Sequence, residues 1–212
     1  FIMKLRDYPD HEVQALLFDF GNVLVEIDFA KVFSIWSNYA GGMDVFHDFS
    51  MNKDNELYEQ GKISTSEFFN SLRGKLNLNL TDEQFLEGWN NIFVSEVSGI
   101  RETLSKVSHK LPLYLFSNTT ISHHEVWSTL YPDLLCMFNQ IFVSYELGAR
   151  KPDAEAFLSV SKIINIDPKH ILFFDDTLEN VTAARKLGMS AVLVKTNEDV
   201  TNHFKFLNFD LK

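Results

Sequence analysis

Four groups of polar residues follow short apolar runs of this sequence, and their side chains could carry out phosphoryl transfer. The groups are Asp19, Ser117-Asn118, Lys151 and Asp175-Asp176. Together they supply three carboxylates, a hydroxyl beside an amide, and one ammonium group. Each group alone is typical of a turn, a helix cap or a loop. Their occurrence in order, after successive strand-like runs, favours a single shared site.

The chemistry of these groups is complementary. The Asp19 carboxylate can attack phosphorus and form an aspartyl-phosphate. Three carboxylates in one place repel each other and phosphate unless a hard cation lies among them, and Mg²⁺ prefers oxygen ligands of this kind. Ser117, with the backbone N–H groups that open the next helix, can hold phosphate oxygens. Lys151 adds a positive charge beside the phosphoryl group. Because phosphoryl transfer depends mainly on positioning and charge stabilisation, this set is sufficient.

The elements that must position these residues are visible as five continuous apolar runs. Such runs, without alternation, are typical of strands buried on both faces. They are Val13–Phe18, Leu113–Phe116, Gln140–Val143, Ile171–Phe174 and Ala191–Val194. Helical patterns lie between them, as in Ala154–Asn165 and in Leu178–Leu187, which ends at Gly188. This alternation predicts an α/β fold with a parallel sheet and helices on both faces. The carboxyl ends of the strands would then bring the polar groups together.

Residues 28–98 interrupt this rhythm with helical patterns only. The predicted helices are Phe29–Tyr39, Asp54–Gln60, Thr65–Lys75 and Asp82–Phe93. Two of them begin with capping-box spacing, Ser64…Glu67 and Thr81…Gln84. We therefore predict a core domain of residues 1–27 and 99–212 and an all-helical insert of residues 28–98. Aromatic residues are expected to fill the insert's interior: Trp36, Phe46, Phe49, Phe68, Phe69, Phe85, Trp89 and Phe93.

Composition excludes several classes of function. The 212 residues carry 19 Lys+Arg against 29 Asp+Glu, a formal net charge of -10. An acidic surface disfavours binding to nucleic acid or to anionic membranes. The apolar runs are too short for a transmembrane helix. Cys136 is the only cysteine, so an intrachain disulfide is excluded, and we expect it to be a small buried hydrophobic residue. This composition suits a reducing compartment, and we expect the protein in the cytoplasm.

The polar groups and their neighbours resemble the motifs of the haloacid dehalogenase (HAD) superfamily of phosphohydrolases. The resemblance rests on these segments: Asp19-Phe20-Gly21-Asn22-Val23, Phe116-Ser117-Asn118-Thr119, Leu147-Gly148-Ala149-Arg150-Lys151-Pro152 and Phe173-Phe174-Asp175-Asp176…Glu179-Asn180. Within the superfamily the chain looks most like small bacterial sugar-1-phosphate phosphatases. The resemblance implies a Rossmann-like core with a small helical cap inserted after the first strand, in agreement with the break at residues 28–98. It also implies a Mg²⁺-dependent phosphatase that acts on a small phosphorylated molecule.

The first three motifs assign roles by resemblance. Asp19 matches the nucleophile and a metal ligand, and Gly21 offers its backbone carbonyl to the metal. Ser117 and Asn118 match the phosphate-binding motif, and Lys151 matches the lysine of the third motif, which is both catalytic and phosphate-binding.

The fourth motif allows two alignments of its acidic pair. Placing Asp176 on the first acid of the family pattern makes it the direct metal ligand. Asp175 and Asn180 then orient bound water or Lys151 without contacting the metal themselves. An exchange of roles between Asp175 and Asp176 is the alternative.

Gly21 departs from the family pattern, because most phosphatases of the superfamily carry a second aspartate there. That residue protonates the leaving group and later activates water, and such help is typically worth roughly 10²–10⁴ in rate. Three interpretations follow: a slow enzyme, a substrate whose leaving group needs little protonation, or another acid, for example from the cap. We favour the second, since the anomeric oxygen of a sugar 1-phosphate is more acidic than an ordinary alcohol.

Two other functions are considered. A 2-haloacid dehalogenase also lacks the second aspartate, but the resemblance implies that such enzymes need no metal and have no use for Asp175-Asp176. A phosphate-binding regulatory protein without turnover would follow if the change to Gly21 had removed activity. The adjacent His123 and His124 suggest a transition-metal site only weakly, and we expect them on an exposed first turn of a helix.

Overall fold

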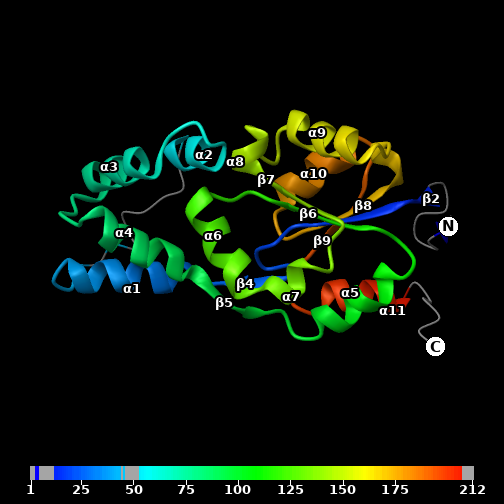
Figure 1. Ribbon diagram of the computed structural model, residues 1–212, viewed down its shortest axis with the longest axis horizontal. Helices are drawn as coiled ribbons and strands as arrows, with labels where there is room; N and C mark the ends of the chain where they lie inside the picture. The colour runs from blue at the N-terminus through cyan, green and yellow to red at the C-terminus, as the bar shows by residue number, and fades with distance from the viewer. Residues whose placement is uncertain (1–2, 5–11, 44, 46–52, 207–212) are drawn as a thin grey trace.

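The computed structural model describes residues 3–4, 12–43, 45 and 53–206. Figure 1 shows an α/β sheet region at one end of the molecule and a group of helices, α1 to α4, at the opposite end. Phe46 and Phe49, which we predicted in the interior of the insert, lie outside the described residues.

A five-stranded parallel sheet forms the centre of the larger region. Its strands are β3 (Ala15–Phe18), β6 (Leu113–Ser117), β7 (Gln140–Val143), β8 (Ile171–Asp175) and β9 (Ser190–Leu193). Their order is β7-β6-β3-β8-β9, so the first strand of the sheet is central and the chain moves outward on one side and then on the other. Leu17 of β3 is in register with Tyr114 of β6 and with Phe173 of β8. The predicted α/β fold and all five predicted strands are confirmed.

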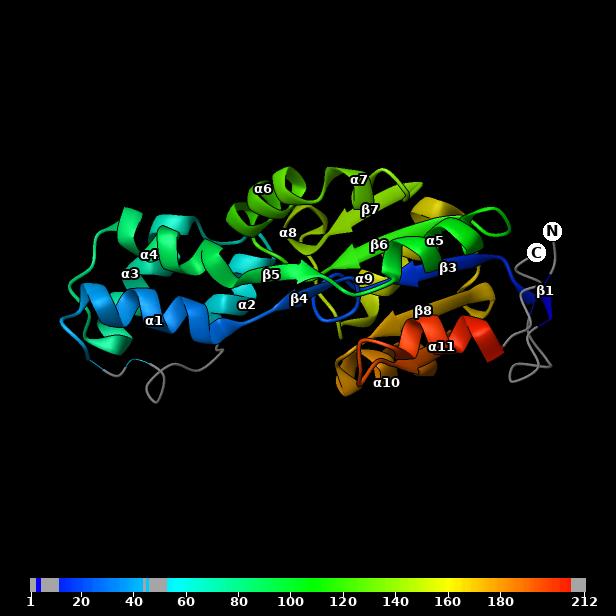
Figure 2. The same cartoon turned by 90° about the horizontal axis from the view of Figure 1, so that it is seen from below.

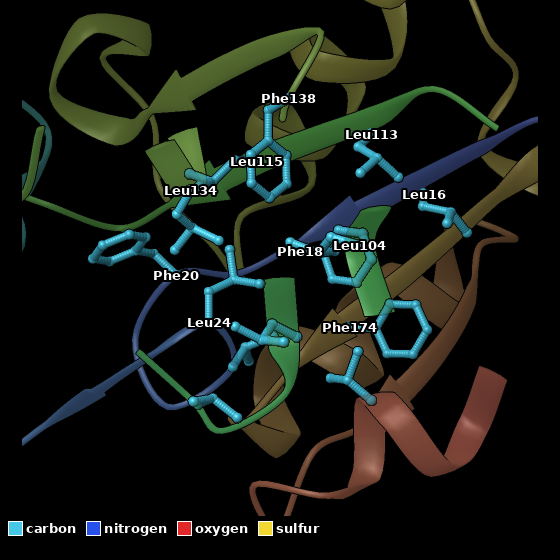
Figure 3. Packing of buried hydrophobic residues seen from close by; sticks show 14 of the residues in the cluster. Leu16, Phe18, Phe20, Leu24, Leu104, Leu113, Leu115, Leu134, Phe138 and Phe174 are labelled. Carbon is cyan, nitrogen blue, oxygen red and sulfur yellow. The ribbon is translucent and has the colours of Figure 1, made fainter. Parts of the chain in front are cut away.

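Side chains alternate between the two faces of this sheet, and each face has its own apolar layer. Leu16 and Phe18 belong to one cluster and Leu17 to another. The first face is covered by α5 (Ile100–Ser108), α6 (Ile121–Leu130), α7 (Pro132–Leu135) and α11 (Asp199–Phe206). The second is covered by α9 (Ala154–Ile164) and α10 (Leu178–Lys186). Figure 3 shows the first layer, in which the rings of Phe18 and Phe174 stack with centroids 4.9 Å apart.

The helical region has a separate core. Its helices are α1 (Phe29–Tyr39), α2 (Lys53–Glu59), α3 (Thr65–Leu76) and α4 (Asp82–Trp89), followed by the 3-10 turn η1 (Asn90–Ile92). Both predicted capping boxes are formed, at Ser64 and at Thr81. Trp36, Phe68, Phe69, Phe85 and Trp89 are buried, whereas Phe93 is partly buried. The Trp36 indole N–H donates to the Phe85 carbonyl at 3.0 Å, which satisfies its polar atom inside the core.

A two-stranded antiparallel ribbon carries the chain out to the helices and back again. It consists of β4 (Val25–Ile27) and β5 (Phe93–Glu96), and Figure 2 shows both strands between the helical end and the sheet. We predicted a helix that ends at Phe93, and we predicted no strand in this segment. Residues 93–96 are half-exposed or exposed, so they lack the continuous apolar run by which the buried strands were predicted. We propose this ribbon as the connection between the predicted core and insert.

Four shorter elements complete the described chain: the paired strands β1 (Met3–Lys4) and β2 (Glu12–Val13), the single turn α8 (Ser144–Leu147), and the 3-10 turn η2 (Pro168–His170). The last described helix is α11, and the ring centroid of its Phe204 lies 5.3 Å from that of Phe174. Residues 207–212 lie outside the described part. None of the helices in the described part is both long and apolar enough to cross a membrane.

The prediction for Cys136 is wrong. Cys136 is exposed because it is the C-cap residue of α7 and its side chain lies outside the apolar cluster that its neighbours join. Its thiol donates to the Asp133 carbonyl at 3.1 Å. The buried positions of this segment are taken by Leu134, Leu135 and Phe138 instead.

Candidate active site

The predicted polar residues meet where β3, β6 and β8 end. They line a cavity of about 450 Å³, and the lining residues among those predicted are Asp19, Gly21, Ser117, Asn118, Lys151, Asp176 and Asn180. Asp175 is the exception, because it lies fully buried at the end of β8, behind the cavity wall. The parallel sheet thus explains how residues up to 161 positions apart, from Asp19 to Asn180, reach one place.

The Lys151 ammonium group is the centre of the site. Its side chain is 1% exposed, and it donates to the Asp19 Oδ1 at 2.6 Å, to the Asp175 Oδ2 at 2.7 Å and to the Phe116 carbonyl at 2.8 Å. These three bonds use all three N–H groups of the ammonium. Removing one partner from such a buried ion pair typically costs about 3–5 kcal/mol, so the ammonium fixes the positions of both carboxylates.

The charges of the cluster do not balance. Lys151 contributes one positive charge, and Asp19, Asp175 and Asp176 contribute three negative charges when ionised, which leaves a net charge of -2. Burial is the main cause that raises the pKa of Asp19 to about 7, with Asp175 and Asp176 adding to it and Lys151 opposing it. The pKa of Lys151 is raised as well, because Asp175 and Asp19 outweigh the opposing effect of burial. A divalent cation would supply the missing charge.

Asp175 and Asp176 have different surroundings. The Asp175 Oδ1 accepts from the Thr177 backbone N–H at 2.8 Å and from the Asn180 amide at 3.0 Å, while its Oδ2 is held by Lys151. Asp176 is partly exposed and lines the cavity, where its Oδ2 accepts from the Asn22 amide at 3.0 Å and its Oδ1 accepts from the Thr177 hydroxyl at 3.2 Å. Asp175 is fully buried and bound to Lys151, so Asp176 is the more open of the two.

The donor set is suitable for Mg²⁺. One carboxylate oxygen from each of Asp19, Asp175 and Asp176 lies within 4.8 Å of the others, and the backbone of Gly21 lines the same cavity. All these donors are oxygens, as a hard cation prefers. Histidine and cysteine are absent from the residues that line this cavity, so a softer metal is not favoured.

Ser117 and Asn118 are placed differently from one another. Ser117 is buried at the end of β6 and lines the cavity. The Asn118 side chain instead forms two hydrogen bonds with the backbone of Lys151. Its amide donates to the Lys151 carbonyl at 2.8 Å, and its Oδ1 accepts from the Lys151 N–H at 2.9 Å. Both polar groups of that side chain are used in positioning Lys151, so a contact of Asn118 with phosphate would come from its backbone.

The space beside Gly21 is occupied by an apolar side chain. A Cβ atom added at Gly21 would lie 3.1 Å from the Ile27 Cδ1, and Ile27 lines the cavity. The position at which most relatives would place a second carboxylate therefore faces a methyl group here. The sequence showed the glycine but gave no sign of Ile27, which comes from β4 of the unpredicted ribbon.

The helical region supplies one wall of the cavity. Asn55, Glu56 and Glu59 of α2 line it together with Arg150 of the core. Arg150 Nε donates to the Glu59 Oε2 at 2.8 Å, and its Nη1 lies 3.6 Å from the Glu56 Oε1. Burial raises the pKa of the Glu59 carboxyl, with Arg150 and Asn55 opposing the shift. We did not predict these residues, although Asn55, Glu56 and Glu59 place three polar side chains within five residues of one predicted helix.

Contacts next to the cavity hold the helices against the core. The His123 Nε2–H donates to the Trp89 carbonyl at 2.7 Å, and the two rings stack with centroids 4.7 Å apart. Tyr58 and Ser122 share a hydrogen bond of 3.0 Å between their hydroxyls. His123 is buried, so our expectation of an exposed turn is wrong for this residue. The reason is that α6 lies against η1 and the end of α4, which the sequence did not reveal.

Comparison with known proteins places this geometry in a family. The family model for haloacid dehalogenase-like hydrolases matches residues 16–194. A D-ribitol-5-phosphate phosphatase from Bacteroides thetaiotaomicron is 27% identical over 203 residues, which cover 88% of this chain and 94% of that protein. A HAD family enzyme from the same organism, crystallised with magnesium and inorganic phosphate, superposes with a TM-score of 0.78 at 28% identity and covers 91% of this chain and 99% of that one.

A longer relative also matches. A drimenol cyclase from Aspergillus calidoustus is 30% identical over 192 residues. Those residues are 89% of this chain and 35% of the cyclase, so the chain spans about a third of the length of that relative.

The buried His123 predicts a loss of stability in mild acid. Burial lowers the pKa of its imidazole from 6.5 to about 4. Between these values the unfolded chain binds a proton that the folded chain does not, so the free energy of unfolding falls as the pH drops from 6.5 towards 4. We expect a loss of about 3 kcal/mol from this group, measured by urea unfolding at several pH values.

The control for this effect is a comparison of variants. His123→Gln should lose this part of the pH dependence, and His109→Gln, at an exposed position, should retain it. Identical pH profiles for wild type and His123→Gln would show that His123 is protonated as easily in the folded state as in the unfolded chain.

Proposed function

Because the chain belongs to the haloacid dehalogenase-like hydrolase family, we propose that it is a Mg²⁺-dependent phosphatase that hydrolyses a small phosphorylated metabolite through an aspartyl-phosphate on Asp19. The observation that carries this proposal is the buried Lys151 bound to Asp19 and Asp175 beside a cavity with a deficit of two positive charges. The similarity to a sugar-phosphate phosphatase and to an enzyme crystallised with magnesium and phosphate supports it.

Asp19 is oriented for attack by its bond to Lys151. The Asp19 Oδ1 is held by the ammonium, which leaves Oδ2 to form the bond to phosphorus. As the P–O bond to the leaving group breaks, the phosphoryl group passes to Asp19, and water then cleaves the acyl-phosphate to regenerate the carboxylate. Ser117 Oγ–H and the backbone N–H groups that open α6 would hold the phosphoryl oxygens.

Mg²⁺ would be held by Asp19, Asp176 and the Gly21 carbonyl. Asp175 and Asn180 would orient bound water or Lys151 without contacting the metal themselves. When bound, Mg²⁺ neutralises charge on the phosphoryl oxygens. Asp175 stays on Lys151 and keeps the ammonium close to Asp19. Asn118 fixes the backbone from which Lys151 extends. This division of roles adopts Asp176 rather than Asp175 as the direct ligand.

The apolar surroundings of Gly21 favour a leaving group that needs little protonation. Neither Gly21 nor the neighbouring Ile27 can donate a proton. A sugar 1-phosphate fits this condition, since its anomeric oxygen leaves as a weaker base than a primary alkoxide. We therefore include a sugar 1-phosphate among the proposed substrates.

Removing the nucleophile tests the covalent route. Asp19→Asn should lower Mg²⁺-dependent phosphate release by roughly 10³-fold or more, because no carboxylate remains to accept the phosphoryl group. The fold should persist, since Asp175 and the Phe116 carbonyl still hold Lys151. Phosphate release from an aryl phosphate and thermal unfolding are the two measurements.

Asp153→Asn is the matched control, because Asp153 is an exposed carboxylate two residues from Lys151 and does not cap α9 with its side chain. It should keep wild-type activity. Near-normal turnover by Asp19→Asn, purified alongside, would refute the covalent mechanism. Chloride release from a 2-haloacid that persists in EDTA would instead favour the dehalogenase.

The leaving-group proposal predicts a preference between two isomers. Glucose 1-phosphate should be hydrolysed with a kcat/KM roughly tenfold or more above that of glucose 6-phosphate, because its leaving oxygen needs less help from an acid. Gly21→Asp should narrow this preference by restoring a carboxyl, provided that the end of Ile27 moves by a few tenths of an ångström. A clear wild-type preference for the 6-phosphate would overturn the proposal.

A further inference from the structure

The wall that α2 contributes to the cavity contains an unsatisfied acceptor. Asn55 is 4% exposed and lines the cavity. Its side-chain amide bonds to the Glu59 carboxyl, but its Oδ1 has no hydrogen-bond partner among the residues that the structure describes. Buried polar atoms are rarely left without partners, since an unmade bond costs stability. A buried carbonyl beside a ligand cavity therefore indicates that a donor on the ligand completes it.

The charges around Asn55 restrict what that ligand can carry. Beyond Asp19, Lys151 and Asp176, the charged residues that line the cavity are Glu56, Glu59, Glu179 and Arg150. One positive and three negative charges leave a net charge of -2 on the rest of the cavity lining, when all are ionised. The guanidinium of Arg150 is already paired with Glu59 at 2.8 Å. A second anionic group on a substrate would find no uncommitted cation among these lining residues, whereas hydroxyl groups would find several acceptors.

We propose that Asn55 and Glu59, the latter held in place by Arg150, form a hydroxyl-binding wall that selects a neutral polyhydroxylated leaving group and rejects leaving groups with a carboxylate or a second phosphate. The inference rests on the proposed phosphatase function and names the substrate class of the same site. A hydroxyl of the substrate donates to the Asn55 Oδ1, and a further hydroxyl donates to Glu59. Nucleotides with several phosphates and phosphorylated carboxylic acids are thereby disfavoured.

The first test compares two phosphates of equal chain length. A pentitol 5-phosphate carries four hydroxyls and n-pentyl phosphate carries none, while the phosphoryl group and the primary leaving oxygen are the same. We expect wild type to favour the pentitol phosphate in kcat/KM, and Asn55→Ala to reduce that ratio about tenfold, the effect of one hydrogen bond. Asn38→Ala, at an exposed position of α1, should keep the wild-type ratio.

A second variant distinguishes recognition from folding. Asn55→Gln keeps both an amide donor for Glu59 and a carbonyl acceptor, so it should retain more of the preference for the pentitol phosphate than Asn55→Ala does. The proposed hydroxyl-binding wall would be refuted if wild type hydrolysed the pentitol phosphate and n-pentyl phosphate with equal kcat/KM. It would also be refuted if Asn55→Ala left the ratio of these two kcat/KM values unchanged. Either result would leave the phosphatase proposal intact. The absence of phosphate release from both compounds and from aryl phosphates would overturn the proposed function itself.

The second test concerns charge. A pentonate 5-phosphate differs from the pentitol 5-phosphate by a carboxylate at the far end, so wild type should hydrolyse it with a kcat/KM about tenfold lower. Glu59→Gln should narrow this difference because it removes one negative charge and releases Arg150, and Glu155→Gln, at an exposed position of α9, should not. Equal wild-type hydrolysis of the two compounds would refute the exclusion of anionic leaving groups.

Discussion

The buried ion pairs of Lys151 are the interaction on which the rest of the site depends. One ammonium without solvent contact must be surrounded by acceptors, and it takes them from three strands of the sheet: Asp19 after β3, the Phe116 carbonyl on β6, and Asp175 on β8. These bonds form only when the ends of β3, β6 and β8 lie side by side, and that arrangement brings the nucleophile and the acidic pair together. Two carboxylates bound to one ammonium, with Asp176 close by, leave a negative charge that a bound divalent cation would balance.

The acidic composition of the chain is consistent with an anionic substrate once this local arrangement is considered. The net charge of -10 describes the whole sequence, but a phosphate entering the cavity meets the charge of Lys151 and of the proposed metal. Among the remaining carboxylates that line the cavity, Glu56 and Glu59 lie on α2, and Glu179 lies on α10 of the core. The core therefore provides the groups for phosphoryl transfer, and the helical region provides the groups that face the rest of the substrate.

Much of this organisation could be predicted from the sequence because buried parallel strands leave a simple pattern. The five apolar runs predicted the sheet, and the residues after the first four runs include the groups now found around Lys151. The missed features depend on contacts between distant segments. Nothing local marks Phe93–Glu96 as a strand, Ile27 as the neighbour of Gly21, or His123 as the buried partner of Trp89. The motif likewise could not show that the side chain of Asn118 is used entirely on the backbone of Lys151.

The central claim is that Asp19 accepts the phosphoryl group while Asp175 remains on Lys151 and Asp176 binds the metal. A crystal structure of the protein with Mg²⁺ and beryllofluoride, which mimics an aspartyl-phosphate, tests this most directly. The account predicts beryllofluoride bonded to an Asp19 oxygen, Mg²⁺ on Asp19, Asp176 and the Gly21 carbonyl, and an unbroken bond between Lys151 and Asp175. Beryllofluoride absent from Asp19, or Asp175 released from Lys151 to bind the metal, would contradict it.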